Sequence, residues 1–312
     1  MNQYILAIDG GATKTTLSLR DTNGKEYFQS TSTSTNYQAI GEEKVEMVLT
    51  DLLKKAYAAT NICEIDVASF AIAGIDTKTG LGIVQRIVEK SCKNSPFHIH
   101  RCIVEIDVHA TLIGLTEDRA GALVIAGTGA IAYATDGKGN IIRSGGWGHR
   151  VGDEGSGYWI GKQIINTIFR FEDGRNDKYT VLKELVFDKL EIQDVEQLND
   201  WLYRSEYTNA QMASIATVLT KALSLGDESA IQIACEAARE LFVLTDAVLK
   251  KLNFIDDDFV VYLNGGILKN NTVILNLYKD YINEVYPNIS FILCEQNPIE
   301  YIANRAIFSL KY

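Results

Sequence analysis

The sequence lacks the features that mark several large classes of protein. No apolar run reaches the ~18 residues that a membrane-spanning helix needs, and no basic segment precedes an apolar one after Met1. Acidic residues outnumber basic ones by 40 to 30, and the Lys and Arg residues form no cluster. We therefore expect a cytoplasmic protein with no membrane partner and no nucleic-acid partner, because binding to nucleic-acid phosphates needs clustered positive charge.

Cysteine is sparse and unpaired. The five cysteines are widely spaced and form no Cys-x-x-Cys pair, so we expect reduced packing residues rather than a disulfide framework or a metal site. The glycine-rich stretch SGGWGHRVGDEGSGYW, Ser144 to Trp159, also lacks the lysine that ends a P-loop. This stretch must therefore belong to a site other than a P-loop.

A unit of strand, glycine turn and strand, followed by a second turn and strand, occurs twice. The first copy joins Gln3–Asp9 to Lys14–Arg20 through GGAT, and the second joins Ala122–Ala126 to Ala130–Thr135 through GTG. This repetition predicts two lobes with related cores in an α/β protein with mixed sheets. Further buried strands are expected at Val67–Ala73, Cys102–Ile106, Val260–Leu263 and Ser290–Leu293.

Both copies have glycines at the first turn. Glycine lets the backbone approach a ligand closely and direct successive N–H groups at one anion. Two such turns are suited to a polyphosphate.

The glycine motifs resemble those of the sugar kinase, Hsp70 and actin superfamily of ATPases. In that superfamily a first phosphate motif resembles Asp9–Thr13, a second resembles Gly127–Gly129, and an adenosine motif resembles Leu263–Gly266, in this order. The resemblance implies duplicated ribonuclease H-like cores of the actin/hexokinase type, flanked by helices, with a cleft between the lobes. The expected lobes are residues 1–117, with 299–312 packing back on them, and residues 118–298.

A narrower resemblance is to the N-acetylglucosamine kinases of the BadF/BadG/BcrA/BcrD ATPase family. It is carried by GGWGHRVGDEGSGYWIG, by Ser34-Thr35-Asn36, and by Glu105-Ile106-Asp107. Two departures are Ala12, where relatives often have glycine, and the pair Tyr301 and Ile302, where small residues are expected.

The resemblance implies a role for each matched residue. The phosphates of ATP would be bound by Gly10, Gly11, Thr13, Gly127, Thr128 and Gly129, and adenosine by Gly265 and Gly266. The sugar would be bound by Asn36, Asp107, Gly146, Trp147 and Asp153. Asp107 would also be the catalytic base, and Asp9 would hold Mg²⁺, either directly or through water.

Several of these residues have ordinary alternatives. Asp9 could form a turn, and Asp107 could cap a helix that begins at Val108. Asp153 and Glu154 are expected as first-turn carboxylates of a helix that runs to about Phe171, with Glu154 purely structural. Trp147 offers a flat apolar surface on which a sugar ring can pack, whereas Trp159 is expected in the core.

The expected activity is transfer of the γ-phosphate of ATP to the 6-hydroxyl of an N-acetylated amino sugar, with N-acetylglucosamine as the first choice. N-acetylmuramic acid, glucosamine and glucose remain open as acceptors. The expected setting is a homodimer in amino-sugar metabolism and cell-wall recycling. A second class is the activator ATPases of acyl-CoA dehydratases and benzoyl-CoA reductases, and a third is a sugar-responsive regulator.

Overall fold

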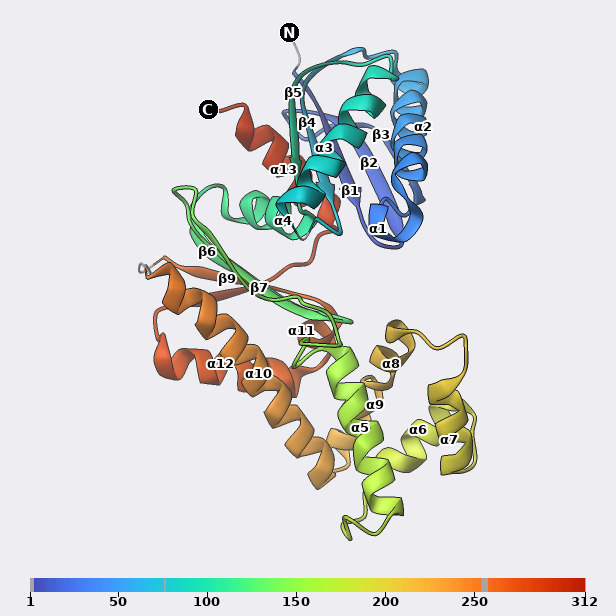
Figure 1. Cartoon of the computed structure of the whole chain (residues 1–312). Coiled ribbons are helices and arrows are strands. Elements are labelled where there is room, and N and C mark those ends of the chain that lie inside the picture. The colour runs from blue at the N-terminus through green and yellow to red at the C-terminus, as the bar shows by residue number, and fades with distance from the viewer. Residues whose placement is uncertain (1–2, 76, 254–257, 312) are drawn as a thin grey trace. The chain divides into compact units, whose positions relative to one another are not determined.

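The computed structural model describes residues 3–75, 77–253 and 258–311, and it divides into two units. The first unit is Met1–Arg119 with Glu295–Tyr312, and the second is Ala120–Cys294. Figure 1 shows how the C-terminal helix, drawn in red, returns to the N-terminal strands, drawn in blue. Within the described residues, no helix combines the length and the apolar character needed to cross a bilayer.

The first unit is a five-stranded mixed sheet in the order β3-β2-β1-β4-β5. Its strands are β1 Tyr4–Gly10, β2 Lys14–Asp21, β3 Glu26–Thr33, β4 Glu64–Ile72 and β5 His98–Glu105. Its helices are α1 Tyr37–Ile40, α2 Glu42–Thr60, α3 Lys78–Lys93, α4 Asp107–Thr116 and α13 Pro298–Ser309. Side chains alternate across β1, so Leu6 and Ile8 pack with α2 and α3, whereas Ile5 and Ala7 pack with α4 and α13.

The second unit repeats this plan in the order β10-β9-β6-β7-β8. Its strands are β6 Ala120–Ala126, β7 Ala130–Asp136, β8 Ile141–Gly145, β9 Val260–Asn264 and β10 Ser290–Leu293. Its helices are α5 Gly157–Glu172, α6 Leu182–Leu190, α7 Val195–Tyr203, α8 Asn209–Ile215, α9 Val218–Ser224, α10 Glu228–Leu252, α11 Gly266–Asn270 and α12 Thr272–Val285.

The two sheets share one pairing scheme. In each, the first strand pairs antiparallel with its hairpin partner and parallel with a later strand: β1 with β2 and β4, and β6 with β7 and β9. The predicted duplication of mixed-sheet cores flanked by helices is confirmed.

Two strands that the sequence predicts as buried lie at sheet edges instead. β10 is exposed along most of its length, including Ile292, and β5 begins at His98 and leaves Cys102 exposed. An apolar run shows that a segment can pair, but it does not show whether a further strand covers it.

The last helix, α13, packs tightly although it lacks the small residues that the family resemblance predicts at positions 301 and 302. Tyr301 and Ile302 are buried, and α13 packs against α4, β1 and β4. The close approach comes from the other partner, because a Cβ added at Gly114 in α4 would lie 1.9 Å from the carbonyl oxygen of Tyr301. The glycine on α4 replaces the small residues expected on α13.

Replacing Gly114 by alanine should therefore destabilise the fold. The added methyl group cannot fit without separating α4 from α13, so we expect Gly114→Ala to lower the free energy of unfolding by about 1–3 kcal/mol. The control is Gly82→Ala in α3, where no atom lies within 4 Å of the new Cβ; better helix propensity should raise stability by about 0.5–1 kcal/mol. Urea unfolding of both variants tests this, and equal stabilisation by both would contradict it.

Candidate functional site

The turn between β1 and β2 leaves two successive backbone amides available. Gly11 N donates to Lys14 O at 2.9 Å and closes the turn. Among the described residues, no acceptor is bonded to the N–H groups of Ala12 and Thr13. Adjacent amides of this kind form an anion-binding concavity.

Alanine fits at position 12 of this turn. Ala12 is not one of the residues with positive φ, so the turn does not require a third glycine there. Gly10 is required for packing, since a Cβ would lie 2.4 Å from both Thr35 Oγ1 and Ile72 Cδ1. The departure at Ala12 therefore leaves the turn intact.

The turn between β6 and β7 has the same character. Gly127 N donates to Gly129 O at 2.9 Å, and the described part of the chain offers no acceptor to the amides of Thr128 and Gly129. The N-terminus of α5 supports this turn, because Gly157 N and Tyr158 N donate to the carbonyls of Gly127 and Thr128. A Cβ added at Gly127 would meet nothing within 4 Å, so a ligand can approach it.

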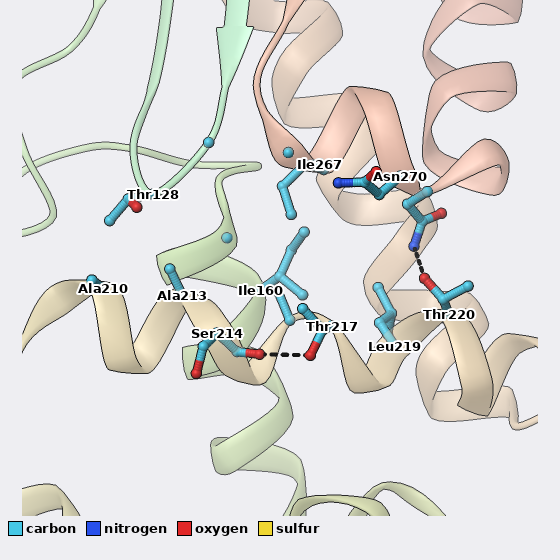
Figure 2. Close-up of a pocket in the computed structure, with 15 residues that line it drawn as sticks. Thr128, Ile160, Ala210, Ala213, Ser214, Thr217, Leu219, Thr220, Ile267 and Asn270 are labelled. Carbon is cyan, nitrogen blue, oxygen red and sulfur yellow. Dashed lines mark hydrogen bonds between the residues drawn. The ribbon is translucent and has the colours of Figure 1, made fainter. Parts of the chain in front are cut away.

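A pocket of about 420 Å³ opens beside this second turn. Thr128 lies on one side of it, and Ile267 and Asn270 lie on another (Figure 2). Gly127 and Gly266 also line it. The second phosphate motif and the adenosine motif, far apart in sequence, therefore line one cavity within the second unit.

Helices α8 and α9 supply a wall of this pocket that sequence reasoning missed. Ala210, Ala213 and Ser214 of α8 and Thr217, the N-cap of α9, line the cavity (Figure 2). The spacing of three and four residues puts Ala210, Ala213 and Ser214 on one side of α8. This run of small residues is the sequence signal that could have pointed to a pocket wall in the segment Asn176–Leu252.

The two glycines of the adenosine motif have different structural roles. Gly265 has φ +94°, and a Cβ there would lie 2.2 Å from the carbonyl oxygen of Ala126, so this residue must be glycine for β9 and β6 to meet. Gly266 lines the pocket and has room for a Cβ, the nearest atom being Asn270 Nδ2 at 3.7 Å. A side chain at position 266 would therefore fill the cavity without breaking the fold.

Two carboxylates interact at the carboxyl ends of β1 and β5. Burial, and then the charge of Asp107, raise the pKa of Asp9 from 3.8 to about 6, against a smaller opposing effect of Lys14. Repulsion between carboxylates is what a divalent cation relieves, and oxygen ligands are those that Mg²⁺ prefers. Asp9 therefore fits the magnesium role predicted for it.

Asp107 is the first residue of α4 and not the residue before it. The cap position is occupied by Ile106, which has no side-chain bond to the helix, while Asp107 Oδ1 accepts a hydrogen bond from Val108 N at 2.9 Å. The helix thus begins one residue earlier than the capping interpretation assumes. One oxygen of Asp107 supports the helix end, which an asparagine could also do.

Asn36 has a structural role that the sequence did not show. It caps the short helix α1 by accepting from Gln38 N at 3.0 Å, and its side chain lies against Gly74, where a Cβ would be 2.7 Å from Asn36 Oδ1. Its predicted contact with a sugar stays a prediction.

The glycine-rich loop after β8 holds its tryptophan outward. Trp147 is 66% exposed, and the guanidinium of Arg143 lies 4.4 Å from its ring centroid. Arg143 also donates to the carbonyls of Gly145 and Gly146, so one cation fixes both the loop backbone and the ring. Trp159 packs against the core, as predicted.

The prediction that Asp153 and Glu154 lie in the first turn of a helix is wrong. α5 begins at Gly157 with Ser156 as its cap, and Asp153 precedes it with φ +65°. Burial raises the pKa of Asp153, whose Oδ1 accepts from Ala130 N at 3.2 Å. A Cβ at Gly129 would lie 2.9 Å from this carboxylate, so Asp153 ties the loop to the second turn.

The raised pKa of Asp9 predicts a stability that depends on pH. The contribution of Asp9 to the free energy of unfolding is fully present below pH 3.8 and is lost as pH rises through about 6. This follows because ionisation of Asp9 is opposed only in the folded state. Without divalent cations, Asp9→Asn should therefore raise the free energy of unfolding at pH 7 by about 1–3 kcal/mol. Urea unfolding at pH 4 and pH 7 measures this.

The control for this prediction is Asp51→Asn, on the exposed face of α2. It should leave the dependence on pH unchanged. The prediction fails if Asp9→Asn and wild type lose the same stability between the two pH values.

The chain is similar to a known protein family and to known kinases. Residues 6–293 match the BadF/BadG/BcrA/BcrD ATPase family. The sequence is 31% identical to an N-acetylmuramic acid/N-acetylglucosamine kinase of Clostridium acetobutylicum, over 93% of this chain and 94% of the relative. It is 30% identical to an N-acetyl-D-glucosamine kinase of Dictyostelium discoideum, over 92% of each chain.

Solved structures show the same fold. A candidate N-acetylglucosamine kinase from Chromobacterium violaceum has a TM-score of 0.69 at 19% identity, over 97% of this chain and 99% of that one. A ROK hexokinase from Thermus thermophilus has a TM-score of 0.59 at 14% identity, over 99% of both chains. Sequence and fold agree, and the chain belongs to the BadF/BadG/BcrA/BcrD ATPase family.

Proposed function

We propose that this protein is an ATP-dependent kinase that phosphorylates the 6-hydroxyl of an N-acetylated amino sugar, with N-acetylglucosamine as the main acceptor. The observation that carries the proposal is the pocket of the second unit, where the second phosphate motif and the adenosine motif meet beside two amides with no acceptor in the described part of the chain. Its two curated relatives are kinases that name N-acetylglucosamine as acceptor, which supports the choice of sugar.

In this proposal the adenosine of ATP occupies the 420 Å³ pocket. The small side chains of α8 and α9 leave room for it, and Gly266 allows it to contact backbone. The amides of Thr128 and Gly129 then donate to its phosphates. The family resemblance assigns the turn that holds Ala12 and Thr13 to phosphate binding as well. Mg²⁺, held by Asp9, would supply positive charge to the phosphate chain.

Phosphoryl transfer needs a base for the sugar hydroxyl. The proposed base is Asp107: its carboxylate accepts the proton as the sugar oxygen bonds to the γ-phosphorus and the bond to the β-phosphate oxygen breaks, releasing ADP. One Asp107 oxygen already accepts from Val108 N, which fixes the orientation of the carboxylate.

Sugar recognition is assigned to the exposed ring of Trp147, the backbone of Gly146 and the side chains of Asn36 and Asp153. Trp147 has Arg143 close to its ring and remains largely accessible, which suits stacking on a sugar. The acceptor is N-acetylglucosamine alone, or N-acetylmuramic acid as well, as the name of one relative suggests. Glucosamine is the remaining alternative within this class.

An acceptor panel tests the proposed function. ADP release should be fastest with N-acetylglucosamine and should depend on Mg²⁺, and the product should carry phosphate on its 6-oxygen. No release with any amino sugar would overturn the proposal. Iron and a brown colour in anaerobically purified protein would favour the activator ATPases instead.

Three further parts of the proposal rest on family resemblance: a homodimer, a cytoplasmic location and a role in cell-wall recycling. Light scattering of the purified protein tests the first. A mass equal to one chain of 34.6 kDa would contradict it.

Gly266→Val should weaken ATP binding selectively. The branched side chain would enter the pocket, whereas the backbone at this position already tolerates a Cβ. We expect the KM for ATP to rise at least about tenfold, a loss of ~1.4 kcal/mol, with the KM for the sugar nearly unchanged. Steady-state kinetics measure both constants. A folded variant with wild-type KM for ATP would show that adenosine binds elsewhere.

Asp107→Asn should abolish most of the turnover. Asparagine keeps an oxygen for Val108 N, so stability should be near that of wild type, but it cannot take the proton. We expect kcat to fall by about 10²–10⁴ with ATP affinity largely kept. Thermal unfolding and isothermal titration with ATP are the controls. Turnover within about threefold of wild type would exclude Asp107 as the base.

A further inference from the structure

Three potential metal ligands converge where β4 and β5 begin. Glu64 is the first residue of β4 and pairs in register with His98, the first residue of β5. The Nε2 atom of His100 lies 3.0 Å from Glu64 Oε2, and the rings of His98 and His100 have centroids 4.9 Å apart. One ligand atom from each of the three residues lies within 4.8 Å of those from the other two.

The chemistry of this cluster favours a borderline-soft cation. Two imidazole nitrogens and one carboxylate oxygen are ligands that Zn²⁺ takes, with bonds of about 2.0–2.2 Å and a fourth position for water. Donors around such an ion lie roughly 3.3 Å apart by the tetrahedral geometry. The side chains are exposed, so small rotations bring the donors to that spacing without disturbing the core.

We propose that Glu64, His98 and His100 bind one divalent transition-metal ion of the zinc type at the edge of the first unit's sheet. It is the one such cluster within the described residues. The ion links the edge strand β5 to its neighbour β4 and leaves one coordination position open.

This site is separate from the proposed magnesium role of Asp9. His98 and Glu105 are the two ends of β5, and a strand of that length spans roughly 20–25 Å, so the metal is remote from Asp107. Mg²⁺ prefers oxygen ligands and dehydrates reluctantly, so millimolar Mg²⁺ should not displace the bound ion. Binding of a zinc-type ion at this site is therefore independent of the kinase activity.

Titration of the untagged protein with Zn²⁺ in the presence of Mg²⁺ tests the site. We expect one ion per chain by isothermal titration, and d–d absorption bands of tetrahedral type when Co²⁺ is used instead. Zn²⁺ should also raise the melting temperature, because it binds the folded β4–β5 pair. Binding weaker than millimolar would overturn the proposal.

Substitutions locate the ion. The double variant His98→Ala/His100→Ala should lose Zn²⁺ affinity by at least about a hundredfold, and Glu64→Gln by about tenfold. The binding control is His149→Ala, which removes a histidine of the other unit. Unchanged Zn²⁺ affinity in the double variant would overturn the assignment.

A separate readout keeps the two proposals apart. The double variant should phosphorylate the sugar at the wild-type rate and show wild-type circular dichroism, since both histidines are exposed. A wild type that binds Zn²⁺ but lacks kinase activity would contradict only the proposed function. A kinase without Zn²⁺ binding would contradict only the metal site.

Discussion

The proposed phosphate site of each unit depends on a hairpin turn. The turn closes itself with one backbone hydrogen bond and leaves two amides that have no bonded acceptor among the described residues. In the first unit Gly11 donates to Lys14 O, and in the second Gly127 donates to Gly129 O. The strands on either side of each turn lie inside the sheets. β1 and β6 pair antiparallel on one side and parallel on the other, whereas β2 and β7 pair antiparallel on both sides. Because buried strands hold each turn, its amides are oriented before any ligand arrives, which is what electrostatic preorganisation requires.

The same arrangement concentrates negative charge where a cation is needed. Asp9 is the last residue but one of β1, and burial together with the charge of Asp107 opposes its ionisation. Replacing this carboxylate would remove the free-energy cost of ionising it in the folded chain. In the proposed function, however, a carboxylate is the group that can hold Mg²⁺. Stability and function therefore favour different residues at position 9, a conflict that is common at sites built to bind charge.

Features encoded by neighbouring residues could be predicted from the sequence, and features created by distant contacts could not. The hairpins and their glycines were predictable because turn chemistry and alternation are local signals. The exposure of β10, the pocket wall on α8 and α9, and the close approach of Gly114 to Tyr301 depend on segments far away in the chain. The predicted position of Asp153 is wrong because a carboxylate shortly before an apolar period is equally typical of the first turn of a helix and of the loop before it.

The position of Asp153 has a consequence for how acceptor choice can vary. Both backbone groups of Ala130, the residue after the second turn, bind the glycine-rich loop: its carbonyl accepts from Gly146 N, and its amide donates to Asp153. The two ends of the loop are thereby anchored to one residue beside the proposed phosphate site. The middle of the loop, with exposed Trp147 and Val151, has no such anchor to the turn among the described contacts. In the proposed function, substitutions there would change which sugar packs on the loop while the amides of the turn keep their orientation. Acceptor specificity and phosphate binding would then vary separately within one short segment.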